Sequence, residues 1–138
     1  MGAGPIEREN GAVTGAVRFA MQTEGLAIGA AAILIYFRAG FSWQEFALLI
    51  LVPDLSMLGY LAGPRVGAFA YNAAHSYVGP ALVVAEAFAT SDMLMMPIAL
   101  IWIAHIGFDR MLGFGLKYGA GFGYTHLGRV GRAAPERA

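Results

Sequence analysis

Four long apolar segments dominate the chain and restrict what it can fold into. Each has about 20 or more mostly apolar residues, the length that a helix needs to cross the hydrocarbon core of a bilayer. Short polar connections separate the segments, and none carries a charged face wide enough to meet water. The segments cover residues 19–37, 43–63, 66–89 and 94–116.

The composition also indicates a membrane protein. Hydrophobic residues make up 58% of the 138 residues and charged residues 13%, whereas soluble domains average about 45–50% and about 25%. Nine acidic and nine basic residues give a net charge of zero. The sequence therefore favours a lipid bilayer as partner and argues against a nucleic-acid binder, which would have a basic excess.

Lipid also restricts the secondary structure. Backbone groups within a bilayer must be satisfied inside their own segment, which favours helices over strands, and short connections make neighbouring helices antiparallel. The sequence predicts an all-α, integral membrane protein with one domain, an up-down four-helix transmembrane bundle. Residues 1–12 and 119–138 are expected to be flexible polar termini. Three glycine pairs would allow close helix approach: Gly25/Gly29, Gly59/Gly63 and Gly63/Gly67.

The basic residues predict an orientation. Lysine and arginine are concentrated in cytoplasmic loops. The two termini and the second connection together carry seven of them, and the opposite side carries only Arg38. We therefore expect a multi-pass protein of the bacterial inner membrane with its N- and C-termini in the cytoplasm.

Three of the expected helices place ionisable side chains at one depth. At 1.5 Å per residue, four such side chains lie about 10–17 Å from the cytoplasmic ends of their segments. They are Asp54, His75, His105 and Asp109. A charge at mid-bilayer costs at least about 2.5–3.5 kcal/mol. We therefore expect the four side chains to face the interior and to satisfy one another.

These four side chains are the predicted ligands of one divalent metal ion. Two carboxylates and two neutral imidazoles around a divalent cation sum to zero charge. Nitrogen and oxygen ligands without sulfur suit Zn, Mn or Fe, and His105 and Asp109, four residues apart, share one helix face. Two interpretations without metal remain: a buried hydrogen-bonded His105–Asp109 pair, and a polar helix–helix contact for His75.

Further polar residues are expected near these four side chains. Pro53 and Pro80 loosen the helices next to Asp54 and His75, which favours a pocket. Glu24 is a candidate general base, or else a helix-start residue favoured by the macrodipole. The candidate substrate-binding residues, of which the two arginines could equally be interfacial anchors, are Arg65, Arg110, Ser76, Tyr71 and Asn72. Lys117 is expected to be an interfacial anchor, and His126 to be solvated.

Long sequence blocks carry a resemblance to a family. The blocks "PDLSMLGYLAGPRVGAFAYNAAHSYVGP", "WIAHIGFDRMLGFGLKY" and "THLGRVGR" resemble the small bacterial membrane proteins catalogued as domain of unknown function 4260. The likeness runs from about Glu24 to Arg132. It implies the four-span topology and names no activity.

A second, shorter resemblance concerns chemistry. The order Asp54, then His75–Ser76, then His105 and Asp109 is similar to membrane-bound metal-dependent hydrolases of the LexA-regulated type. The chain departs from them in having one early aspartate rather than a close pair, and in lacking the His-Arg that opens their central motif. The resemblance therefore implies at most one metal ion.

Three functional classes remain open, and so does whether the chain is an enzyme. The first is a metal-dependent hydrolase acting on a lipid-like ester or phosphoester at the cytoplasmic leaflet. The second is a non-catalytic membrane carrier or proton relay that uses the same Asp/His cluster. The third is a haem protein with His75 and His105 as axial ligands. Because four short helices barely shield such a site, a homodimer is a further expectation.

Overall fold

The computed structural model describes residues 12–119 and 121–129, so the expectations for residues 1–11 and 130–138 lie outside the described part of the chain. The predicted all-helical class is confirmed for the described residues, with one small hairpin added. The helices are α2 (Gly15–Arg38), α3 (Trp43–Leu49), the 3₁₀ helix η1 (Val52–Ala62), α4 (Pro64–Ala74), α5 (Val78–Thr90) and α6 (Met96–Leu112). The hairpin strands are β1 (Tyr124–Thr125) and β2 (Gly128–Arg129).

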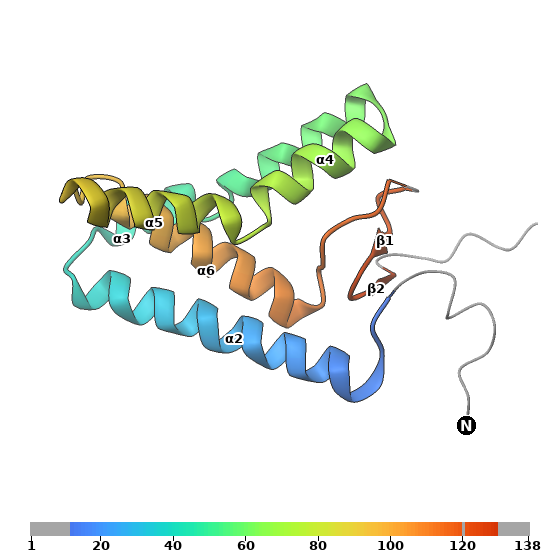
Figure 1. Cartoon of the computed structure of the whole chain (residues 1–138), viewed down its shortest axis with the longest axis horizontal. Coiled ribbons are helices and arrows are strands. Elements are labelled where there is room, and N and C mark those ends of the chain that lie inside the picture. Colours follow the sequence, from blue (N-terminus) through green and yellow to red (C-terminus); the bar gives the residue numbers. More distant parts are fainter. Residues whose placement is uncertain (1–11, 120, 130–138) are drawn as a thin grey trace, which may run out of the picture.

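Helices α2 and α6 run side by side in opposite directions and form the main packing contact of the fold (Figure 1). Glycines allow this close approach. A Cβ added to Gly107 of α6 would lie 2.6 Å from the backbone nitrogen of Gly29 and 2.7 Å from the carbonyl oxygen of Gly25. The predicted contact role of Gly25 and Gly29 is therefore confirmed.

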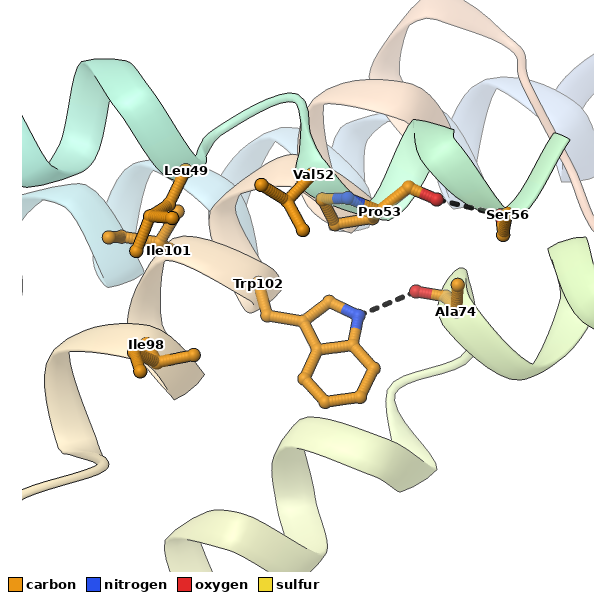
Figure 2. A pocket seen from close by; sticks show the side chains of 8 residues that line it. All are labelled: Leu49, Val52, Pro53, Ser56, Ala74, Ile98, Ile101 and Trp102. Atoms are coloured by element: carbon orange, nitrogen blue, oxygen red, sulfur yellow. Dashed lines mark hydrogen bonds between the residues drawn. The ribbon is translucent and has the colours of Figure 1, made fainter. Parts of the chain in front are cut away.

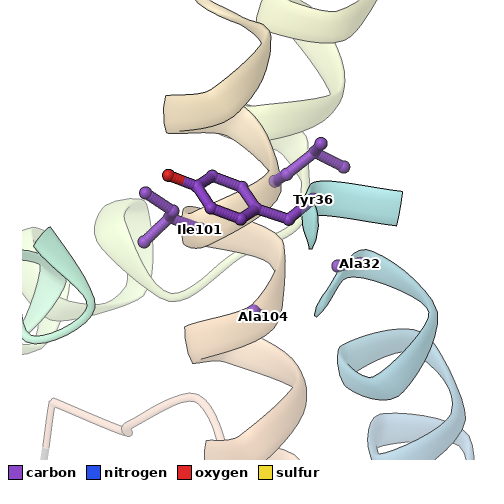
Figure 3. Close-up of a cluster of buried hydrophobic side chains, with 5 residues drawn as sticks. Ala32, Tyr36, Ile101 and Ala104 are labelled. Atoms are coloured by element: carbon purple, nitrogen blue, oxygen red, sulfur yellow. The ribbon is translucent and has the colours of Figure 1, made fainter. Parts of the chain in front are cut away.

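A hydrophobic cluster fixes the other end of the same helix pair. Tyr36 at the end of α2 lies across α6 near Ile101, and Ala32 and Ala104 belong to the same buried cluster (Figure 3). Tyr36 is fully buried, and its hydroxyl donates to the carbonyl oxygen of Ser42 at 2.8 Å. This bond holds the connection between α2 and α3 against the hydrophobic cluster and so fixes the position at which α3 begins.

The second apolar segment is a broken helix rather than a continuous one. After α3 the chain turns at Ile50 and Leu51 and continues as η1, with Pro53 in its first turn. Proline lacks a backbone N–H and fits best at a helix start. The predicted loosening at Pro53 is thus present, and it leaves the carbonyl oxygen of Ile50 free to accept a bond from outside the helix.

The third apolar segment also breaks, between α4 and α5, at His75–Tyr77. Two side chains of α6 bind the carbonyl groups at the break. Trp102 Nε1 donates to the carbonyl oxygen of Ala74 at 2.5 Å, and Arg110 Nη2 donates to that of His75 at 3.1 Å. The α4–η1 pair consequently leans away from α2 (Figure 1). The four segments therefore do not form four uninterrupted helices.

The segment after α6 packs back onto the helices. The His126 backbone N–H donates to Leu116 at 3.1 Å, and its carbonyl oxygen accepts from the N–H of Val13 at 2.8 Å. Leu127 is fully buried. The expected flexible tail is therefore corrected for residues 121–129, because contacts with the segments before α2 and after α6 hold the hairpin at one end of the helix pair.

Large apolar side chains are exposed on every helix of the described chain. Examples are Leu34 on α2, Leu48 on α3, Leu61 on η1, Phe69 on α4, Phe88 on α5 and Leu112 on α6. By length and composition, two stretches are able to cross a membrane, Gly15–Arg38 and Trp43–Ala62.

Candidate metal centre

The structure brings together the four side chains that the sequence placed at one depth. Asp54 comes from η1, His75 from the break after α4, and His105 and Asp109 from α6. One ligand atom from each lies within 4.8 Å of all the others. Both histidines are buried, and both aspartates are partly exposed.

Five of the six distances within this group are short. His75 Nε2 lies 3.3 Å from an oxygen of Asp54 and 3.3 Å from one of Asp109. His105 Nε2 lies 3.4 Å from the same two oxygens, and the two Nε2 atoms are 3.0 Å apart. Four ligand atoms held about 2.0–2.1 Å from a tetrahedral ion lie about 3.3–3.4 Å from one another. The group therefore has the dimensions of a metal site.

Both imidazoles are oriented by backbone carbonyl groups. His75 Nδ1 lies 2.9 Å from the carbonyl oxygen of Tyr71, and His105 Nδ1 lies 2.6 Å from that of Ile50. A carbonyl oxygen only accepts, so each Nδ1 must carry the proton and donate it. In its neutral form, each ring then directs the lone pair of its Nε2 atom toward the other ring and toward the carboxylates. Metal-binding histidines are usually held in this way.

This geometry does not fit the bis-histidine haem predicted as a third possibility. Axial ligands must bind the iron from opposite faces of the macrocycle. With the Nε2 atoms 3.0 Å apart and the ring centroids 5.0 Å apart, no space for a porphyrin lies between His75 and His105. The haem expectation is corrected on this ground.

Both carboxylates also line a cavity of about 230 Å³, so one side of the cluster is accessible. Tyr71, a predicted substrate-binding residue, lies in its wall. Its ring stacks on that of His75 with the centroids 3.7 Å apart, and its hydroxyl donates to Asp109 at 3.5 Å. Tyr71 therefore positions two members of the cluster as well as bordering the cavity.

A second cavity, of about 330 Å³, lies on the other side of η1 and is almost wholly apolar (Figure 2). Residues three apart in a 3₁₀ helix share a face. Pro53 and Ser56 accordingly line this apolar cavity, whereas Asp54 and Met57 line the polar one. Trp102 of α6 forms the opposite wall in Figure 2. One short helix thus separates an apolar cavity from the Asp/His cluster.

Three predicted site residues do not join the cluster. Glu24, the predicted general base, is exposed on α2 and lines a separate hollow together with Tyr77 and Arg110. Arg65 is exposed near the start of α4. The hydroxyl of Ser76 accepts the backbone N–H of Val78 at 3.2 Å and thus serves the helix break.

Arg110 and His126 have structural partners. Arg110 binds the carbonyl oxygen of His75, and its Nη1 lies 3.5 Å from His126 Nε2. His126 Nδ1 accepts the backbone N–H of Leu116 at 2.8 Å, so the expectation of a solvated His126 is wrong. Burial lowers the pKa of His126, and the charge of Arg110 lowers it further.

The burial of Lys117 beside the polar cavity was not predicted from the sequence. Lys117 is 5% exposed and borders the polar cavity. The side chain of Asn72, a predicted substrate-binding residue, accepts from the backbone N–H of Lys117 at 2.6 Å and donates to its carbonyl oxygen at 2.7 Å. Asn72 therefore acts by positioning Lys117. No periodic pattern signals this, because Lys117 follows the end of α6.

A family model described as domain of unknown function 4260 matches residues 18–130. The chain belongs to this family. No curated protein and no solved structure matches the chain. The DUF4260 region contains all four members of the Asp/His cluster and also Lys117, so the candidate centre lies inside the domain that defines the family.

Proposed function

We propose that this protein is a membrane enzyme whose Asp/His cluster binds one divalent metal ion and hydrolyses an ester or phosphoester bond in a lipid-like substrate. One observation carries the proposal. Two imidazole Nε2 atoms, with their Nδ1 protons already committed to carbonyl groups, converge with two carboxylate oxygens at 3.0–3.4 Å. Four acceptors this close repel one another unless a cation or added protons lie between them, and a divalent cation satisfies all four at once.

The donor set supports a choice of metal. Two nitrogens and two carboxylate oxygens suit Zn, Mn or Fe, and the near-tetrahedral spacing favours zinc. Because the four side chains would fill a tetrahedral ion, hydrolysis would need a fifth coordination position. There a divalent ion would lower the pKa of a bound water to about 7 and would polarise a carbonyl or phosphoryl oxygen. Asp54 and Asp109 both border the polar cavity, so a substrate would approach the ion from that side.

The surface supports placement in a membrane. The stretch Trp43–Ala62 is 20 residues long, has a mean hydropathy of 1.6 and has no buried residue in its apolar window. Exposed apolar side chains on all the described helices are stable where lipid replaces water. With four spans and both termini in the cytoplasm, the centre lies in the cytoplasmic half of the bilayer.

Hydrolysis can be tested on the purified protein in a neutral detergent. We expect the zinc-loaded protein to release nitrophenol from para-nitrophenyl dodecanoate or from the para-nitrophenyl ester of dodecyl phosphate. The rate should fall to that of chelator-treated protein in His75→Ala, and it should persist in Glu24→Gln, because Glu24 lies outside the cluster. Equal rates for the zinc-loaded wild type and His75→Ala would contradict the proposed activity.

A non-catalytic proton relay is the second candidate. The observation in its favour is that the His75 and His105 Nε2 atoms, 3.0 Å apart, are close enough to share one proton. With protons in place of metal, the two aspartates would balance protonated imidazoles within the cluster. Absence of bound metal together with intact folding would favour this function over hydrolysis.

A further inference from the structure

Lys117 is a buried cation on the wall of the cavity that the two carboxylates share. Its side chain is 5% exposed, and the cavity walls also include Asp54, Asp109 and Tyr71. Burying an ammonium group is costly unless it is paired and hydrogen-bonded. The position of Lys117 beside the candidate metal centre therefore calls for a physical explanation.

The local structure holds Lys117 firmly in this place. The Asn72 side chain binds both backbone polar groups of Lys117, and Lys117 Nζ donates to the carbonyl oxygen of Phe122 at 2.8 Å. The ammonium also lies 3.7 Å from the ring centroid of Phe122 and 4.6 Å from that of Tyr71. These contacts orient the cation, but aromatic faces and a carbonyl group carry no full negative charge. Burial accordingly lowers the pKa of Lys117, an effect that Asp109 opposes.

The charge balance of the site changes when a metal ion is added. Asp54 and Asp109 contribute two negative charges to the polar cavity and Lys117 contributes one positive charge, whereas Arg110 lines a different hollow together with Glu24. A divalent ion at the cluster leaves the polar cavity with an excess of one positive charge in a largely apolar surrounding. Such an excess is strongly unfavourable at low dielectric unless an anion enters.

We propose that the polar cavity is an anion subsite, in which a phosphate or carboxylate group of the substrate binds between Lys117 and the metal ion. This inference rests on the proposed metal centre and specifies its substrate class. The shared chemistry is an anionic oxygen group, which either a lipid head group or a free phosphate supplies. The apolar cavity lined by Pro53 and Trp102 lies across η1 from this subsite and is not part of it (Figure 2).

Isothermal titration of the full-length, zinc-loaded protein in a neutral maltoside detergent tests the subsite. The probes are inorganic phosphate and dodecyl phosphate. We expect Lys117→Met to weaken binding of both by about tenfold or more, because a charge-assisted hydrogen bond is lost. Arg65→Met removes an exposed positive charge on α4 and should leave both affinities unchanged. Lys117→Arg keeps the charge and should retain most of the binding.

The outcomes separate this inference from the metal proposal. Tighter binding of dodecyl phosphate than of inorganic phosphate supports a lipid head group as the source, and equal binding supports free phosphate. A zinc-containing protein that binds neither probe, or that binds both equally well in wild type and Lys117→Met, overturns the anion subsite alone. A wild-type protein that takes up no zinc overturns the metal centre and the subsite with it. Zinc content of each variant, measured in parallel, identifies which case applies.

Discussion

His105→Ala is expected to remove bound metal from the protein and to lower its stability. The substitution deletes one ligand atom, and it also deletes the donor that binds the carbonyl oxygen of Ile50 at 2.6 Å. Loss of a group that only orients a metal ligand through a hydrogen bond usually costs about 10–100-fold in metal affinity, so loss of the ligand itself should cost at least about 100-fold. The unsatisfied carbonyl group adds about 1–3 kcal/mol of destabilisation. Zinc content after dialysis and the thermal midpoint measure the two effects.

His126→Ala is the matched control for this substitution. His126 is also a partly buried histidine with a backbone partner, yet it lies outside the cluster. It should lose some stability and keep its full metal content. Retention of metal by His105→Ala, or equal loss of metal in both variants, would show that the ion is not bound by the four predicted ligands.

Gly107→Ala is expected to lower the folding stability of the α2–α6 helix pair. The new Cβ would lie 2.6 Å from the backbone of Gly29, and backbone atoms cannot move aside as a flexible side chain does. Overpacking typically costs about 1–3 kcal/mol, and the better helix propensity of alanine returns only about 1 kcal/mol. Denaturation followed by circular dichroism measures the difference.

Gly119→Ala provides the comparison. Its added Cβ would meet only the side chain of Arg65, at an ordinary contact distance of 3.6 Å. We expect its free energy of unfolding to stay within about 0.5 kcal/mol of wild type. If Gly107→Ala were as stable as Gly119→Ala, the close α2–α6 approach would not be a feature of the folded protein.

The candidate metal ligands could be predicted from the sequence because the expected depth of a residue in a membrane follows from its distance along the segment alone. Segment boundaries and the lysine and arginine bias gave Asp54, His75, His105 and Asp109 a common level, and the cost of buried charge required them to face one another. The structure brings these four together. Glycine spacing likewise predicted the helix contact at Gly25 and Gly29, because a small residue every fourth position forms a flat stripe on a helix. Gly59 and Gly67 also meet between η1 and α4, where a Cβ on Gly59 would lie 3.3 Å from Gly67 Cα.

Other features depend on contacts that no local pattern reveals. Gly63, predicted to pack between helices, instead has a φ of 117° at the turn between η1 and α4. The break at His75–Tyr77 is stabilised by Trp102 and Arg110, which lie about thirty residues further along the chain. The hairpin strands have only two residues each, too few for an alternating pattern, and Lys117 becomes a cavity residue only because this hairpin folds back.

Elemental analysis of the wild-type protein, purified in detergent without added chelator, tests the central claim most directly. We predict close to one Zn, Mn or Fe per chain, and a thermal midpoint that falls when a chelator removes the ion, because the ligand set then loses the cation that holds its carboxylates together. A protein with no stoichiometric metal, whose melting is unchanged by chelator, would contradict the metal centre.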